Sequence, residues 1–147
     1  SDIDKPYNVG YIAGVFDLFH IGHLNMFKRA KEQCRYLIVG VVSDEGVRLN
    51  KQAEPFVPFD ERIEMVRSCK YVDEAVKLPL DFCGTRDMFK IYHFDVQFSG
   101  SDYEHDPGWL AEKEFLEKNG STMVFFPYTQ STSSTKLKKA IEDRTNN

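Results

Sequence analysis

The amino-acid sequence predicts an α/β domain built on a mainly parallel five-stranded sheet with helices on both faces. Short β-rich apolar runs alternate with segments of helical periodicity along the whole 147-residue chain. The run YLIVGVV, residues 36–42, has the near-continuous hydrophobicity of a strand that is covered on both faces. Because connections that contain a helix join parallel strands, this alternation predicts the parallel sheet.

The elements of the first half follow from the apolar pattern. Residues 9–15 are the first expected strand and residues 36–42 the second. Four apolar side chains between them recur at helical spacing: Leu24, Phe27, Ala30 and Cys34. The polar stretch 43–54 breaks the pattern and predicts a loop. A helix is expected to enter at Pro58. Its buried face carries Ile63, Val66 and Cys69.

The second half repeats the alternation, with strands expected at residues 74–78, 95–99 and 123–126. Thr85 is expected to cap one helix, and Asp106-Pro107 and Asn119-Gly120 mark the ends of the next. Ser133 or Ser134 is expected to cap a final helix. The inward face of that helix is expected to hold Leu137, Ala140 and Ile141.

This order fits a Rossmann-like doubly wound fold. Ligands in such folds bind beyond the carboxyl ends of the strands, where the strand order reverses. The loops after the first, fourth and fifth strands are therefore expected to hold the chemistry. No internal repeat, low-complexity tract or linker stands out, so residues 1–147 are expected to form a single domain.

The composition is that of an ordinary globular protein, with 41% apolar and 29% charged residues. No apolar run approaches the ~20 residues of a membrane-spanning helix, and the N-terminal residues lack the pattern of a signal peptide. The net charge of −4 argues against a protein that coats nucleic acid. Cys34, Cys69 and Cys83 are odd in number and widely spaced, which favours a reducing cytoplasm over a disulfide framework.

The most distinctive segment, GVFDLFHIGH at residues 14–23, follows the first strand and places His20 and His23 around Gly22 at the start of a helix. Residues three apart share a helix face, and a helix N-terminus offers amides and partial positive charge to a phosphate chain. Two imidazoles there can donate hydrogen bonds to phosphate oxygens. A zinc pair is the rival interpretation, but no third Cys or His follows at a plausible spacing.

This segment resembles the signature of the cytidylyltransferases within the nucleotidyltransferase superfamily, and above all that of the glycerol-phosphate enzymes. The similarity runs from residue 9 to residue 141. It includes three further segments: Ser43-Asp44-Glu45, Asp60-Glu61-Arg62 and KYVDE at residues 70–74. The resemblance implies that the nucleotide contacts Gly14, Val15, Phe16, Asp17 and Gly22, the last of which lets a ligand approach the backbone closely.

The resemblance also indicates two cations. In the family a lysine after the second strand contacts the phosphates of both substrates, and Lys51 matches it; the alternative is a solvated surface charge. Arg62 opens a helix, and the resemblance implies that its guanidinium grips phosphate with two donors. The alternative is a structural ion pair with Asp60 or Glu61. With the two histidines, Lys51 and Arg62 complete the expected catalytic set.

The loop after the fourth strand, FSGSDY at residues 98–103, supplies further candidates. Gly100 gives a ligand access to the backbone. Asp102 can accept a hydrogen bond from an exocyclic amine of the nucleotide, and it is also a common turn residue. Trp109 follows on the acceptor side and belongs either to the core or to the wall of the acceptor pocket.

The last loop, residues 127–136, is rich in hydroxyl groups and precedes a helix. The family has an Arg-Thr-Glu-Gly-Ile-Ser-Thr pattern here. Three residues match it and are expected to bind the nucleotide: Thr129, Ser133 and Ser134. Tyr128 stands at the arginine position and is expected to contact the acceptor. Either Lys136 or Arg62 replaces the lost cation, or the acceptor is an unusual one. A Ser/Thr-rich linker is the alternative interpretation of the segment.

Together these features predict a nucleotidyltransferase that joins the cytidylyl group of CTP to a small phosphorylated alcohol, with glycerol phosphate favoured. The resemblance implies that Mg²⁺ accompanies the triphosphate without a protein metal site, and that the chain forms a homodimer through residues 70–74 and the preceding helix. The alternatives are a choline- or ethanolamine-phosphate cytidylyltransferase, an ATP-dependent adenylyltransferase and a noncatalytic nucleotide-binding module. Neither a nucleic-acid partner nor a membrane is expected.

Overall fold

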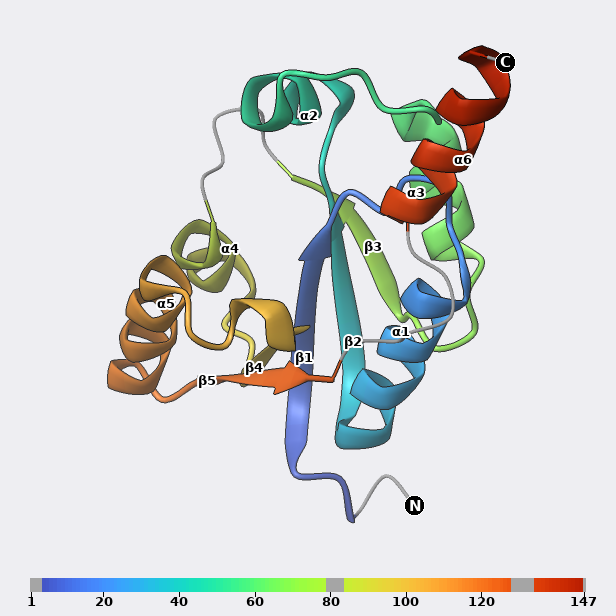
Figure 1. The fold of residues 1–147 in the computed structure, drawn as a ribbon. Coiled ribbons are helices and arrows are strands. Elements are labelled where there is room, and N and C mark those ends of the chain that lie inside the picture. The colour runs from blue at the N-terminus through green and yellow to red at the C-terminus, as the bar shows by residue number, and fades with distance from the viewer. Residues whose placement is uncertain (1–3, 79–83, 128–133, 147) are drawn as a thin grey trace.

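The computed structural model describes residues 4–78, 84–127 and 134–146, and its strands form one five-stranded, entirely parallel sheet (Figure 1). The strands are β1 (Tyr7–Gly14), β2 (Cys34–Val41), β3 (Glu74–Lys77), β4 (Val96–Gly100) and β5 (Thr122–Phe126). They lie in the order β3-β2-β1-β4-β5, so the winding reverses between β1 and β4. The predicted Rossmann-like doubly wound class is therefore confirmed.

Helices cover both faces of this sheet. The helices of the described residues are α1 (Ile21–Gln33), α2 (Asp44–Lys51), α3 (Phe59–Arg67), α4 (Thr85–Tyr92), α5 (Pro107–Lys118) and α6 (Ser134–Asn146), with a short 3-10 turn η2 (Ser101–Tyr103). Of these, α1 and α3 cover one face, and α4 and α5 cover the other. Because side chains alternate along a strand, Leu37 and Val39 pack with α1 and α3, whereas Tyr11 and Ile38 pack with α4 and α5. Figure 1 shows these two helix pairs on opposite sides of the sheet. No helix among the described residues has the length and apolar composition to cross a bilayer.

The signals at the ends of α5 act as predicted. The Asp106 carboxylate accepts hydrogen bonds from the backbone N–H groups of Gly108, at 2.8 Å, and Trp109, at 3.2 Å. Pro107 occupies the first helical position, where no N–H is needed. Gly120 follows the helix with a φ of 84°, a conformation that favours glycine.

The segment 43–54, predicted to be a loop, contains α2 instead. Ser43 caps this helix, since its Oγ accepts a 3.0 Å hydrogen bond from the backbone N–H of Gly46. Acidic residues in the first turn interact favourably with the positive end of the helix. The apolar pattern misses this helix because Val47 is buried while Leu49 is 67% exposed, so no continuous apolar stripe forms.

Several expectations about helix ends and faces are also wrong. Cys69 lies beyond the end of α3, and Thr85 is the first residue of α4, whose N-cap is Gly84. Cys34 is the first residue of β2 and not part of α1. It joins the same core cluster as Phe27, which is why the apolar spacing continues past the helix end.

On α6, Leu137 is half-buried as expected, but Ala140 and Ile141 are exposed. That helix lies beyond the carboxyl end of the sheet, where Lys138 meets Asp17, and not across a sheet face (Figure 1).

Candidate active site

The connection from β1 to α1 lies at the carboxyl edge of the sheet, beside the reversal in strand order. The Gly14 carbonyl accepts a 3.0 Å hydrogen bond from the backbone N–H of Val42, which ties the ends of β1 and β2 together. Phe16 and Leu18 then adopt φ values of 56° and 52°. Left-handed backbone is strained in residues other than glycine, and such strain gathers at functional sites.

The two histidines begin α1 and bind its free amides. His20 is the N-cap residue, and its Nδ1 accepts a 3.0 Å hydrogen bond from the backbone N–H of Gly22. The Nδ1 of His23 accepts a 3.2 Å bond from the backbone N–H of His20. A neutral imidazole that accepts at Nδ1 carries its hydrogen on Nε2. Each histidine therefore has an Nε2–H group available to donate to a ligand.

Burial keeps this pair neutral. The two rings stack with centroids 3.9 Å apart, and the edge of Phe16 packs against His23 at 5.4 Å. Burial lowers the pKa of His20, and burial together with the neighbouring His20 lowers the pKa of His23 to about 3. Two neutral donors at a helix N-terminus suit phosphate. The zinc alternative gains no support, since no three His, Cys, Asp or Glu residues gather for a metal in the described part of the chain.

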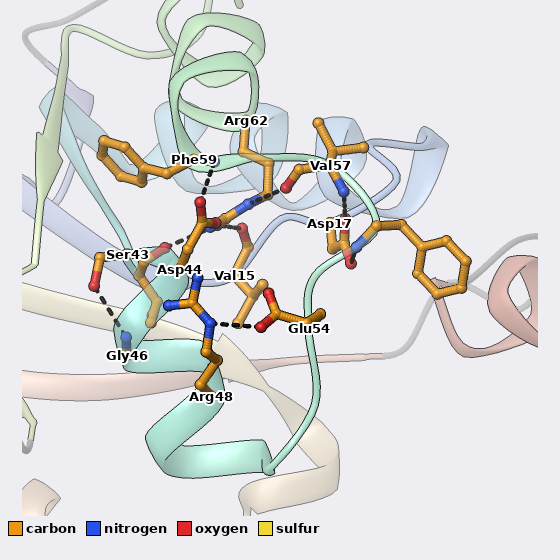
Figure 2. A network of polar contacts seen from close by, with 12 residues as sticks. Val15, Asp17, Ser43, Asp44, Gly46, Arg48, Glu54, Val57, Phe59 and Arg62 are labelled. Atoms are coloured by element: carbon orange, nitrogen blue, oxygen red, sulfur yellow. Dashed lines mark hydrogen bonds and ion pairs between the residues drawn. The ribbon is translucent and has the colours of Figure 1, made fainter.

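Arg62 faces into the protein, which corrects its prediction as a phosphate ligand. Its side chain has no exposed surface. The guanidinium donates to three carbonyl oxygens, each at 2.8 Å: Val15, Val42 and Val57. It also pairs with Asp44 Oδ1 at 2.7 Å (Figure 2). These contacts use four of the five N–H groups of a guanidinium. Arg62 is therefore a structural residue of the site.

Asp17, expected to contact the nucleotide, also faces inward and is 2% exposed. Its carboxylate accepts hydrogen bonds from the backbone N–H groups of Phe56, at 2.9 Å, and Val57, at 3.0 Å. It thereby fixes the connection between α2 and α3 to the connection after β1, as Figure 2 shows for Asp17 and Val57. Neither Asp44 nor this connection was assigned from the sequence, although the Ser43-Asp44-Glu45 segment lies in the similarity to the cytidylyltransferases.

The loop after β4 brings its candidates to the same edge. Gly100 ends β4, and a Cβ there would lie 2.6 Å from Asp102 Oδ1. Asp102 is exposed in η2. Trp109 packs against the core on the α4 and α5 face, and its ring stacks on the exposed Tyr103 ring at 4.7 Å. Trp109 is thus a half-buried residue at the edge of the core, and its ring supports an aromatic surface.

Several predicted residues lie at or beyond the ends of the described segments. The backbone of Lys51 ends α2 and that of Ser134 begins α6, but the structure does not describe their side chains. Tyr128, Thr129 and Ser133 lie outside the described residues. Lys138 on α6 was not among the residues predicted from the sequence, and its Nζ lies 3.1 Å from Asp17 Oδ2. Its position about one helical turn after Ser134 was the available signal.

Comparisons with known proteins identify the family of the chain. Residues 11–140 match the family model described as Cytidylyltransferase-like. An FAD synthase of Thermococcus kodakarensis is 33% identical over 133 residues, 89% of this chain and 87% of that protein. The glycerol-3-phosphate cytidylyltransferase of Bacillus subtilis is 31% identical over 128 residues, 87% of this chain and 92% of that protein. An ethanolamine-phosphate cytidylyltransferase of Dictyostelium discoideum is 42% identical over 93 residues, 63% of this chain but 26% of that protein.

Solved structures share the fold. A lipopolysaccharide core biosynthesis protein of Thermoplasma volcanium has a TM-score of 0.68 at 23% identity, over 86% of this chain and 99% of that one. A pantoate-beta-alanine ligase of Francisella tularensis has a TM-score of 0.62 at 13% identity, over 94% of this chain and 70% of that one. These similarities concern the architecture alone.

The buried histidines predict a specific acid sensitivity. The pKa of His23 is about 3 in the folded chain, against about 6.5 when unfolded, so the unfolded chain binds a proton first as the pH falls. The contribution of neutral His23 to the free energy of unfolding is therefore fully present above pH 6.5. It is lost as the pH falls from 6.5 to 3. The loss is at most about 1.4 kcal/mol per pH unit.

Urea unfolding of the parent and of His23→Asn at several pH values from 6.5 downward checks this. Asparagine keeps an acceptor near the position of Nδ1 and binds no proton in this range. We expect the variant to lose less free energy of unfolding per pH unit than the parent. Equal slopes for the two proteins would contradict a buried neutral His23.

Proposed function

The chain belongs to the cytidylyltransferase-like family, and from that membership we propose that it transfers the cytidylyl group of CTP to a small phosphorylated alcohol. Glycerol phosphate is the favoured acceptor. The family and the relatives are nucleotidyltransferases, and so is this chain. The observation that carries the proposal is the pair of neutral histidines with Nε2–H donors at the start of α1.

The proposed reaction is a direct displacement. A phosphate oxygen of the acceptor attacks the α-phosphorus of CTP, the bond from that phosphorus to the β-phosphate oxygen breaks, and pyrophosphate leaves. The attacking oxygen is already anionic, so no general base is needed, and catalysis rests on positioning and charge stabilisation. His20 and His23 donate their Nε2–H groups to phosphate oxygens in the crowded transition state. Being neutral, they act as dipoles and give up no proton.

We retain Lys51 as a proposed phosphate ligand, and we propose that Mg²⁺ arrives with the triphosphate. Asp17 and Asp44 each accept a backbone N–H and pair with a cation. Within the described residues, this supports a metal held mainly by phosphate oxygens and water. When bound, Mg²⁺ shields the negative charge of the triphosphate.

Transfer of an adenylyl group to a flavin phosphate is the second candidate. It is favoured by the FAD synthase relative, which matches 89% of this chain. A flavin phosphate is also the phosphate ester of an alcohol, so the same displacement would serve. A choline phosphate acceptor is a further option, because the exposed Tyr103 ring stacked on Trp109 offers an aromatic surface to a quaternary amine.

A pyrophosphate-release screen tests these proposals. CTP, ATP, UTP and GTP are each combined with glycerol phosphate, choline phosphate, ethanolamine phosphate and FMN. We expect CTP with glycerol phosphate to give a kcat/KM at least about tenfold above other pairs, a difference of about 1.4 kcal/mol in the barrier. A dominant ATP and FMN pair would replace the proposal with the flavin alternative. Absence of turnover with every pair would favour the noncatalytic module.

Matched histidine variants connect the activity to the site. His20→Asn and His23→Asn keep an acceptor near Nδ1 and lose the Nε2–H donor. We expect each to lower turnover about 10²–10³-fold with little change in nucleotide affinity. His93→Asn is the control, because His93 is exposed at the end of α4, just before β4, and adopts a left-handed conformation that asparagine tolerates. Turnover of His20→Asn equal to that of His93→Asn would remove the assignment.

We also propose a homodimer that forms through α3 and residues 70–74. Met65 on α3 is 53% exposed, and Lys70 Nζ lies over the half-buried Tyr71 ring at 5.2 Å. Pairing of two such faces would cover these apolar side chains. Light scattering at micromolar concentration is expected to give the mass of two chains. The mass of one chain would remove the proposal.

The thiols support a proposed cytoplasmic location. Cys34 is buried and Cys69 half-buried, and both are free. Burial raises the pKa of the Cys34 thiol to about 11, so it stays protonated and unreactive. Cell fractionation checks the location, and recovery outside the cytoplasm would exclude it.

A further inference from the structure

Lys138 on α6 contacts Asp17 in the connection after β1, which leads to His20 and His23. Its Nζ lies 3.1 Å from Asp17 Oδ2 and 5.7 Å from the centre of the Phe56 ring. Three parts of the chain meet here: the connection after β1, the connection between α2 and α3, and α6. The Lys138 side chain is 30% exposed, whereas the Asp17 side chain is 2% exposed.

The carboxylate that Lys138 meets is charged and needs a cation. Burial would raise the pKa of Asp17, but the hydrogen bonds from Phe56, Lys138 and Val57 outweigh burial and lower it. A buried charge without a partner is costly, whereas a paired and hydrogen-bonded one is tolerated. The contact between Lys138 and Asp17 is therefore more than a surface ion pair.

This ion pair is connected to the one made by Arg62. The backbone of Val57 donates its N–H to Asp17 and accepts a 2.8 Å hydrogen bond from Arg62 Nε at its carbonyl. Asp17 itself lies three residues before His20. A displacement of Lys138 thus acts on the backbone that carries the first histidine.

We propose that Lys138 is a positioning residue, which holds α6 against the connection after β1 and so fixes the start of α6 relative to His20 and His23. The contact would preform the site for the phosphate chain of a nucleotide. The proposal rests on the proposed function only in taking a nucleoside triphosphate as ligand. A direct contact of Lys138 with phosphate is the competing role, and the Asp17 contact argues against it.

Three variants test the positioning role. Lys138→Met keeps the aliphatic stem and removes the charge, Lys138→Arg keeps the charge, and Lys139→Met is the control on the exposed neighbouring residue. We expect Lys138→Met to raise the KM for the nucleotide about tenfold with kcat within about threefold, as for lost uniform binding. Lys138→Arg should restore the KM, and Lys139→Met should leave it unchanged. An unchanged KM in Lys138→Met would overturn the proposal.

A double-mutant cycle separates positioning from phosphate contact. If Lys138 acts through Asp17, then adding Lys138→Met to Asp17→Asn should change the KM little further, because contacting residues are not additive. A full tenfold further rise in that background would overturn the proposal in favour of direct phosphate binding.

Hydrogen exchange of the ligand-free protein gives a readout that does not depend on the substrate. We expect the amides of α6 to exchange faster in Lys138→Met than in the parent or in Lys139→Met, since the helix loses its anchor. A chain that uses ATP instead of CTP would show the same exchange and the same KM effect with ATP. This result distinguishes a wrong nucleotide in the proposed function from a wrong positioning role for Lys138. Equal exchange in Lys138→Met and Lys139→Met would overturn the anchoring.

Discussion

The guanidinium of Arg62 is the interaction on which the rest of the site depends. It binds three carbonyl oxygens from three separate connections, those of Val15, Val42 and Val57. These three carbonyls lie in connections outside the strands and helices, so no hydrogen bond of the sheet or of a helix uses them. Backbone groups that are removed from water need partners. A planar group with five donors can serve all three at once and still pair with Asp44. Without it, three half-buried carbonyls would lose this donor together, and Asp44 would keep the hydrogen bond from the backbone N–H of Phe59 but lose its ion pair.

This arrangement determines the net charge of the polar network beside the two histidines. Arg62 pairs with Asp44, and Lys138 pairs with Asp17. Within each pair the positive and negative charges cancel. The network therefore fixes the backbone and contributes no net positive charge toward a phosphate chain. In the proposed function, attraction for phosphate therefore comes from the N-terminus of α1, from the Nε2–H groups of two neutral histidines and from Lys51. The inward-facing Arg62 therefore does not support its predicted role as the cation that replaces the arginine which the resemblance places at Tyr128.

Much of the fold and the position of the histidine pair could be predicted from the sequence, because the residue patterns that indicate them are local. Alternating apolar runs indicated the parallel sheet, and the spacing of His20 and His23 indicated a site at the start of a helix. The role of Arg62 could not be predicted, because three of its four partners lie 18 or more residues away in the chain. Its acidic partner, Asp44, lies 18 residues away, whereas the neighbouring Asp60 and Glu61 are exposed. No local pattern shows that a charged side chain is buried.

The most direct test of this account is the free energy of unfolding of Arg62→Lys in urea, without nucleotide. Lysine keeps the charge beside Asp44 but cannot reach the three carbonyls together. We expect the free energy of unfolding to fall by about 2–5 kcal/mol, because the carbonyls that the guanidinium binds lose their hydrogen-bond donors. A variant as stable as the parent, but with weakened nucleotide binding, would contradict it and identify Arg62 as a phosphate ligand.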